Sequence, residues 1–203
     1  MTDIGSRYYN RASSVSFRRT TERWGGLSNM CAGFDLNVNG VAIQSSEVLY
    51  QACRFPEHPS LQNEILAQSN PMVAKRIARG NIKYTRIGWD SNRISIMKWV
   101  VFVKLCQNWD SFFYLLDLTE DRSIIEHSEK DGFWGCKIQG DSFCGVNALG
   151  RILMFTRDAA RIKGRDAFSV IHPLKIPKFD LLGEPILPVS AEHKKSNFIP
   201  LPL

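Results

Sequence analysis

The chain has 203 residues, of which 44% are hydrophobic and 23% are charged, and these values are typical of a soluble globular domain. No apolar run approaches the roughly 18 residues of a membrane-spanning helix, and the polar residues 1–10 lack the apolar region of a signal peptide. The composition therefore predicts a cytoplasmic protein that makes no contact with a membrane.

The net charge of +6 favours an anionic partner, either a nucleic acid or a phosphorylated small molecule, although a solvated surface also explains most of the basic residues. The basic residues cluster in two places along the chain, and one of these clusters is Arg18, Arg19 and Arg23. The five cysteines show no Cys-x2-Cys spacing, and the four histidines are scattered along the chain. We therefore expect neither a metal ion nor a cofactor.

The first half of the chain predicts a lead-in, a hairpin and three helices. Residues 1–22 show little periodicity and predict an extended lead-in. Residues 34–43 alternate between apolar and polar around Asn39-Gly40, which predicts a β-hairpin. Ser45 or Ser46 can cap a helix that runs to Arg54. Two further helices are expected at 61–68 and 71–80.

The second half predicts three more helices and a non-helical tail. The longest periodic pattern covers 91–108, Asp110 can cap a helix at 112–118, and Asn147 can cap one at 148–160, with a glycine-rich loop at 131–145 between the last two. Beyond Gly164, frequent prolines predict an extended tail. The expected fold is a mainly α, single compact helical domain with a small β-hairpin: a lead-in at 1–22, a main domain at 23–163 and a Pro-containing tail at 164–203 packed on it.

Four segments combine uncommon residues in a fixed order: Trp-Gly-Gly-Leu-Ser-Asn-Met at 24–30, Ser-Ser-Glu-Val-Leu-Tyr-Gln-Ala-Cys-Arg-Phe-Pro at 45–56, Lys-Asp-Gly-Phe-Trp-Gly at 130–135, and Gly-Val-Asn-Ala-Leu-Gly-Arg-Ile-Leu-Met at 145–154. Together they resemble the NADAR family, also called YbiA-like. The resemblance implies a chiefly α fold for the main domain and a catalytic activity that cuts the bond between ribose C1 and a nitrogen.

Three residues are candidates for catalysis. Glu47 lies on a polar helix face, where it either supports the helix start or, as the resemblance implies, takes part in catalysis. Lys104 follows the apolar stripe of a helix that is expected to be buried, and desolvation there lowers the pKa towards a nucleophilic amine, unless the amine snorkels to water. The resemblance favours a site residue. It also implies a site role for Asp131, which can otherwise be a simple turn residue.

The expected substrate-binding residues follow from the same motifs. Trp134 can stack on a base, and Gly135 allows close approach of the backbone to a ligand. Ser28, Asn29 and Gln51 can donate or accept hydrogen bonds, Trp89 matches an aromatic position of the family, and the helix start near Asn147 can receive a phosphate. The family usually has an acid where this chain has Gly88, which weakens any role for the neighbours of Trp89.

The resemblance implies two substrates. One is ADP-ribose linked to guanine in nucleic acid, and the other is a ribosylamino-pyrimidine phosphate intermediate of riboflavin synthesis. The basic charge favours ADP-ribosylated DNA, with an antitoxin or repair role opposite a cognate ADP-ribosyltransferase toxin. A non-catalytic ADP-ribose reader is a third hypothesis. For an enzyme, attack of a neutral Lys104 on C1 competes with hydrolysis by a water that Glu47 or Asp131 activates.

Overall fold

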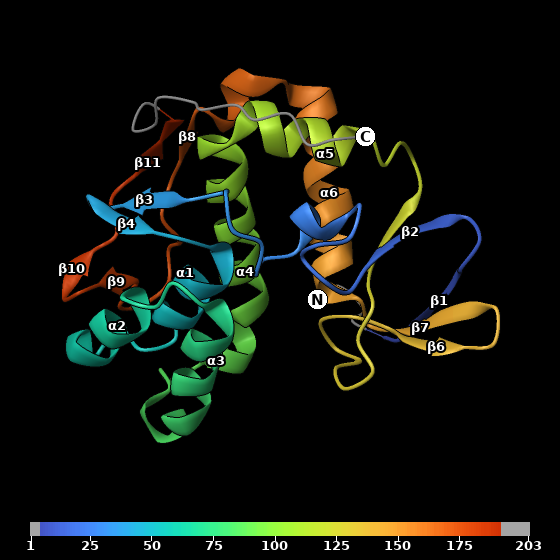
Figure 1. Ribbon diagram of the computed structural model, residues 1–203. Helices are drawn as coiled ribbons and strands as arrows, with labels where there is room; N and C mark the ends of the chain where they lie inside the picture. The colour runs from blue at the N-terminus through green and yellow to red at the C-terminus, as the bar shows by residue number, and fades with distance from the viewer. Residues whose placement is uncertain (1–4, 192–203) are drawn as a thin grey trace.

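A long helix, α4 (Trp89–Gln107), runs through the centre of the computed structural model, which describes residues 5–191 (Figure 1). Helices α1 (Ser46–Ala52) and α6 (Ala148–Lys163) pack against it. Helices α2 (Pro59–Leu66) and α3 (Pro71–Gly80) lie with α1 on one side, and a three-stranded sheet lies on the other. Because α4 is covered from both sides, most of its apolar side chains are buried.

Local signals place the first helices and the hairpin. The Ser45 hydroxyl accepts a hydrogen bond from the amide of Val48 at 3.4 Å and so caps α1. The Asn70 side chain caps α3 in the same way, and α3 ends at Gly80 as predicted. The hairpin is also confirmed: strands β3 (Leu36–Val38) and β4 (Val41–Ile43) pair, and Asn39 and Gly40 between them have φ values of +53° and +79°.

The prediction of a single domain is confirmed, but the prediction of a mainly α fold is wrong. The domain is mixed α/β, with 43% helix and 19% strand in several small sheets. These strands have only two to four residues each, which is too short for an alternating pattern to be recognised. Several of them pair with segments that are distant in the sequence, as residues 14–17 do with residues 123–126, and only the folded chain brings such partners together.

The predicted lead-in contains two of these strands. Strand β1 (Arg7–Asn10) pairs antiparallel with β7 (Ser142–Gly145), which also pairs with β6 (Lys137–Gln139). Strand β2 (Ser14–Phe17) pairs parallel with β5 (Ser123–Glu126), and its Val15 and Phe17 are buried. The part of the lead-in within the described residues is therefore integrated into the domain, while residues 1–4 lie outside that range.

Two segments near the ends of helices differ from the prediction. The chain after α4 makes a π-helical turn, η3 (Trp109–Phe113), before α5 (Tyr114–Asp117), and Asp110 provides no cap because its carboxylate pairs with Arg165 at 3.0 Å. Asn147 precedes α6 with φ of +53° but does not cap it through its side chain. Short 3-10 turns, η1 (Gly25–Leu27) and η2 (Ile82–Tyr84), complete the connections.

The described part of the predicted tail packs on the domain. It starts with the 3-10 turn η4 (Arg165–Phe168), and two strand pairs follow, β8 (Val170–Ile171) with β11 (Val189–Ser190) and β9 (Asp180–Leu181) with β10 (Glu184–Pro185). Residues 192–203 of the predicted tail lie outside the described residues. Between residues 5 and 191, none of the helices has the length and apolarity that crossing a bilayer requires.

Candidate active site

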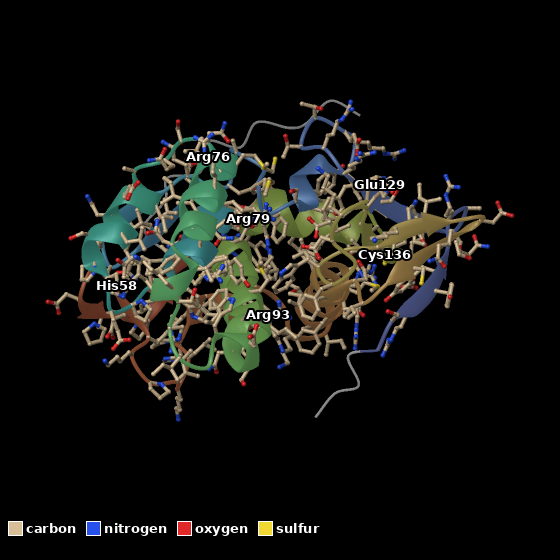
Figure 2. All side chains as sticks on the ribbon, turned by 90° about the horizontal axis from the view of Figure 1, so that it is seen from below. His58, Arg76, Arg79, Arg93, Glu129 and Cys136 are labelled. Carbon is tan, nitrogen blue, oxygen red and sulfur yellow. The ribbon has the colours of Figure 1, made fainter. Side chains whose placement is uncertain are left out.

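A cavity of about 630 Å³ opens between the α1–α3 side of the molecule and the loop that follows β5. The structure brings seven predicted site residues to its wall: Ser28, Asn29, Glu47, Gln51, Trp89, Asp131 and Trp134. The other three, Lys104, Gly135 and Asn147, do not line it. Figure 2 labels two further wall residues, Arg79 of α3 and Arg93 of α4, which lie near the centre of this view.

Glu47 is the buried acid at the start of α1. Its residue is only 5% exposed, and its backbone amide donates to the Asn29 carbonyl at 2.9 Å, which ties α1 to the loop before β3. One carboxylate oxygen, Oε1, accepts a hydrogen bond from Gln51 Nε2 at 2.8 Å. The Nζ atom of Lys75 lies 3.8 Å from the same oxygen. A carboxylate and an amine therefore meet at the cavity wall.

Lys75 is a site residue that the sequence reasoning missed. It lies in the middle of α3, its side chain is 27% exposed, and it lines the cavity. Its sequence neighbours Ala74 and Arg76 are small and polar, so nothing next to it in the sequence separates it from an ordinary surface lysine. The pairing with Glu47 arises only because α1 and α3 pack together.

Glu126 is a second missed residue, at the last position of β5. Its side chain lines the cavity, where its pKa is raised to about 7, mainly by burial and also by the charges of Glu47 and Asp131, against the opposing charge of Lys75. A carboxyl group with this pKa is partly protonated near neutral pH and can give or take a proton. The strand that positions it is only four residues long, and the sequence reasoning did not predict it.

Lys104 lies outside the cavity. It is 1% exposed, and its Nζ donates to the carbonyl oxygens of Gly26 at 2.7 Å and Ser28 at 3.2 Å. The ring centroids of Phe34 and Phe112 lie 4.2 and 4.1 Å from this nitrogen. These contacts favour the ammonium, but burial dominates and lowers the pKa of Lys104 to about 7. The amine thus binds the backbone of the loop that carries Ser28 and Asn29, and it does not line the cavity.

The Asp131 loop shapes the opposite wall. The Oδ1 atom of Asp131 accepts hydrogen bonds from the amides of Phe133 at 3.0 Å and Trp134 at 2.9 Å. This turn presents the indole of Trp134 to the cavity, edge to face with Tyr50 at 5.6 Å. Tyr50 also contacts Trp89 at 5.2 Å. Three aromatic rings, two of them predicted site residues, therefore form one apolar wall.

Gly135 and Asn147 do not line the cavity, and their contacts stabilise the fold around it. A Cβ atom at Gly135 would lie 2.2 Å from the carbonyl oxygen of Glu126, so glycine is needed for the loop to pack on the end of β5. Asn147 donates to the carbonyl of Ile124 at 2.8 Å and accepts from the amide of Glu126 at 3.3 Å. The first amides of α6 donate to carbonyls of residues 133–135. The helix start expected to receive a phosphate is therefore occupied by this loop.

Arginines and unpaired polar atoms complete the wall. Arg54 donates to Thr85 at 2.8 Å and lies 5.2 Å from the Trp89 ring, and Arg93 lies 3.8 Å from the Phe133 ring. Two buried acceptors, Asn29 Oδ1 and Gln51 Oε1, have no hydrogen-bond partner among residues 5–191. Buried polar atoms normally have partners, so these two are suited to receive donors from a ligand. Among the described residues, no three His, Cys, Asp or Glu side chains are placed to bind one metal ion.

Comparison with family models and curated proteins identifies relatives of this chain. A model described as the NADAR domain matches residues 16–161, which include all four sequence motifs. A riboflavin biosynthesis protein of Vibrio vulnificus is 35% identical over 146 residues, which are 71% of this chain and 38% of that protein, so the chain spans less than half of that relative. The N-glycosidase YbiA of Escherichia coli is 32% identical over 149 residues, covering 73% of this chain and 89% of that protein.

Two further matches extend this set. An N-glycosidase of Nostoc punctiforme is 29% identical over 155 residues, covering 73% of this chain and 93% of that protein. The NMR structure of Escherichia coli YbiA superimposes with a TM-score of 0.64 at 30% sequence identity, covering 74% of this chain and 87% of that one. The fold is therefore shared with a solved structure over 74% of the chain.

Proposed function

Because the chain belongs to the NADAR (YbiA-like) family, we propose that it is an N-glycosidase that releases ADP-ribose from guanine bases of DNA. The observation that supports this most is the convergence of Glu47, Glu126 and Lys75 in one cavity, since an amine between acids suits cleavage of a bond from C1 to nitrogen. An antitoxin or repair role opposite a cognate ADP-ribosyltransferase toxin follows from this substrate.

The cavity wall suits the parts of such a substrate. Trp134 and Trp89 offer ring faces or edges to a purine, and Arg54, Arg79 and Arg93 offer charged donors to a diphosphate. Asn29 Oδ1 and Gln51 Oε1 can accept hydrogen bonds from ribose hydroxyls. The net charge of +6 favours approach of a polyanion.

The proposed chemistry starts from a ribose whose C1 carries an exocyclic amine. The ring oxygen takes a proton and leaves C1, which forms an imine with the base nitrogen. The Lys75 amine adds to C1, Glu126 protonates the base nitrogen, and the C1–N bond to the base breaks, leaving a C1–Nζ Schiff base. Water then adds to C1 while Glu47 takes its proton, and the C1–Nζ bond breaks to free the sugar. Asp131 stabilises the developing cation.

Borohydride trapping tests this mechanism. Reduction during turnover should attach the sugar covalently to Lys75, and mass spectrometry of peptides should locate it there. Lys75→Arg keeps the positive charge but cannot form the imine, so its turnover should fall by at least about 100-fold, the scale of losing a positioned catalytic group. An adduct on Lys104 would instead restore the sequence-based assignment, and retained turnover of Lys75→Arg would favour direct attack by water.

The relative from Vibrio vulnificus, named a riboflavin biosynthesis protein, supports a second substrate. A ribosylamino-pyrimidine phosphate also carries C1 on an exocyclic amine, and the same three groups would act on it. Comparing rates of sugar release from this compound and from guanine-ADP-ribosylated DNA separates the two proposals. A reader without catalytic activity would bind both modified ligands and release sugar from neither.

A further inference from the structure

A second, smaller pocket of about 320 Å³ lies beside the cavity, at the exit of β2. Arg18, Arg19, Ser16 and His127 are among the residues that line it. From these groups we propose that the pocket binds a phosphodiester of a nucleic-acid strand whose modified base occupies the cavity. This rests on the proposed function, which it deepens by assigning a binding site for the backbone of the nucleic-acid substrate.

The pocket and the cavity border the same short stretch of chain. Glu126 and Ser128 line the cavity, and His127 between them lines the pocket. The His127 amide donates to the Phe17 carbonyl at 2.8 Å, which joins the turn after β2 to this stretch. Successive side chains of an extended chain point in opposite directions, so the two hollows lie on either side of one extended segment. A nucleic-acid strand whose modified base enters the cavity would therefore cross this segment to place a phosphodiester in the pocket.

The charges in the pocket favour an anion. Glu22 lines it and is attracted by the charges of Arg19 and Arg18, and Glu129 contacts His127 from outside the lining. Glu22 accepts the amide of Arg18 at 2.8 Å, which lowers its pKa, and Glu129 lies 2.7 Å from His127 Nε2. Neither acid forms an ion pair with the Arg18 or Arg19 guanidinium within the described residues, whereas Arg161 and Arg165 pair closely with aspartates. Two exposed guanidinium groups are thus available to a phosphate.

The turn that carries these arginines is held in place before any ligand binds. The Gly25 amide donates to the Glu22 carbonyl at 2.8 Å, and a Cβ atom at Gly25 would lie 2.2 Å from the Thr20 carbonyl oxygen. The turn therefore packs tightly on itself and requires glycine. A preorganised turn loses little conformational entropy when it binds, which favours specific contact over a diffuse charged surface.

Fluorescence anisotropy with a labelled, unmodified single-stranded oligonucleotide tests the pocket directly. The double variant Arg18→Gln/Arg19→Gln should bind at least about 10-fold more weakly than wild type. The slope of log K against log salt should become shallower by about 1.4, since each lost phosphate contact on a single strand contributes roughly 0.7. Lys163→Gln/Lys175→Gln, which removes the same charge from exposed positions elsewhere, should bind nearly as wild type does.

Kinetics then separate this inference from the proposed function. On ADP-ribosylated DNA, Arg18→Gln/Arg19→Gln should raise KM about 10-fold and leave kcat unchanged, while sugar release from a free ribosylated nucleotide should be unaffected. Equal losses of oligonucleotide binding in the two double variants, or no loss in Arg18→Gln/Arg19→Gln, would overturn the proposed role of the pocket. Loss of binding to inorganic phosphate without loss of oligonucleotide binding would also overturn it. Oligonucleotide binding through the pocket by a protein without any glycosidase activity would contradict only the proposed function.

Discussion

At the scale of the residue, the burial of Lys104 makes folding depend on pH. Its pKa is about 7 in the folded chain, against the usual 10.5. Between these values the unfolded chain binds a proton that the folded chain does not, so the free energy of unfolding rises with pH. Relative to Lys104→Met, the wild type should gain up to about 1.4 kcal/mol per pH unit across this window. Urea unfolding at several pH values measures the difference.

The matched control for Lys104 is its helix neighbour Val103, which is also fully buried. Val103→Ala should lower the free energy of unfolding by a constant amount at all these pH values, because it removes packing and no titratable group. Below about pH 7 the difference between wild type and Lys104→Met should become constant, since both states of the wild type are then protonated. Parallel profiles between pH 7 and 10.5 would contradict the burial of a titrating amine.

At the scale of the element, Asn147 connects the start of α6 to β5. Its amide bonds a buried carbonyl, and its φ of +53° is a conformation that asparagine tolerates better than alanine does. Asn147→Ala should therefore cost about 2–4 kcal/mol, the sum of an unsatisfied polar group and the backbone preference. Asn147→Gly removes the side-chain bonds but permits the backbone, so its cost should be smaller. Equal costs in chemical unfolding would exclude the backbone contribution.

At the scale of the whole molecule, the domain depends on its N-terminal strands. Phe17 of β2 is 2% exposed and belongs to the same core as α4 and α6. Phe17→Ala should lower the free energy of unfolding by about 3–5 kcal/mol, as expected for a large buried side chain. Ile162→Ala, at a position that is 84% exposed, should change it by less than about 0.5 kcal/mol. A small effect at Phe17 would mean that β2 is peripheral, as the lead-in prediction implied.

The helices and the hairpin could be predicted because their signals are local. Ser45, Asn70 and Pro71 act within one helical turn, and Asn39-Gly40 supplies the turn of the hairpin without help from other segments. The short sheets could not be predicted in this way. Their strands contribute few residues each, and several have a partner that is distant in the sequence, as β2 and β5 illustrate.

The residues of the candidate site could likewise be predicted only in part. Six of the seven predicted site residues that line the cavity lie in the four motifs, so the sequence by itself determined the family and much of the wall. Which lysine lines the cavity was decided by the tertiary structure, because an apolar helix stripe indicates burial but not which groups the end of the side chain contacts. Packing places the Lys104 amine against the Gly26 carbonyl and the Lys75 amine beside the Glu47 carboxylate. Local periodicity in the sequence can predict whether a side chain is buried, whereas the groups that it contacts depend on how distant elements pack together.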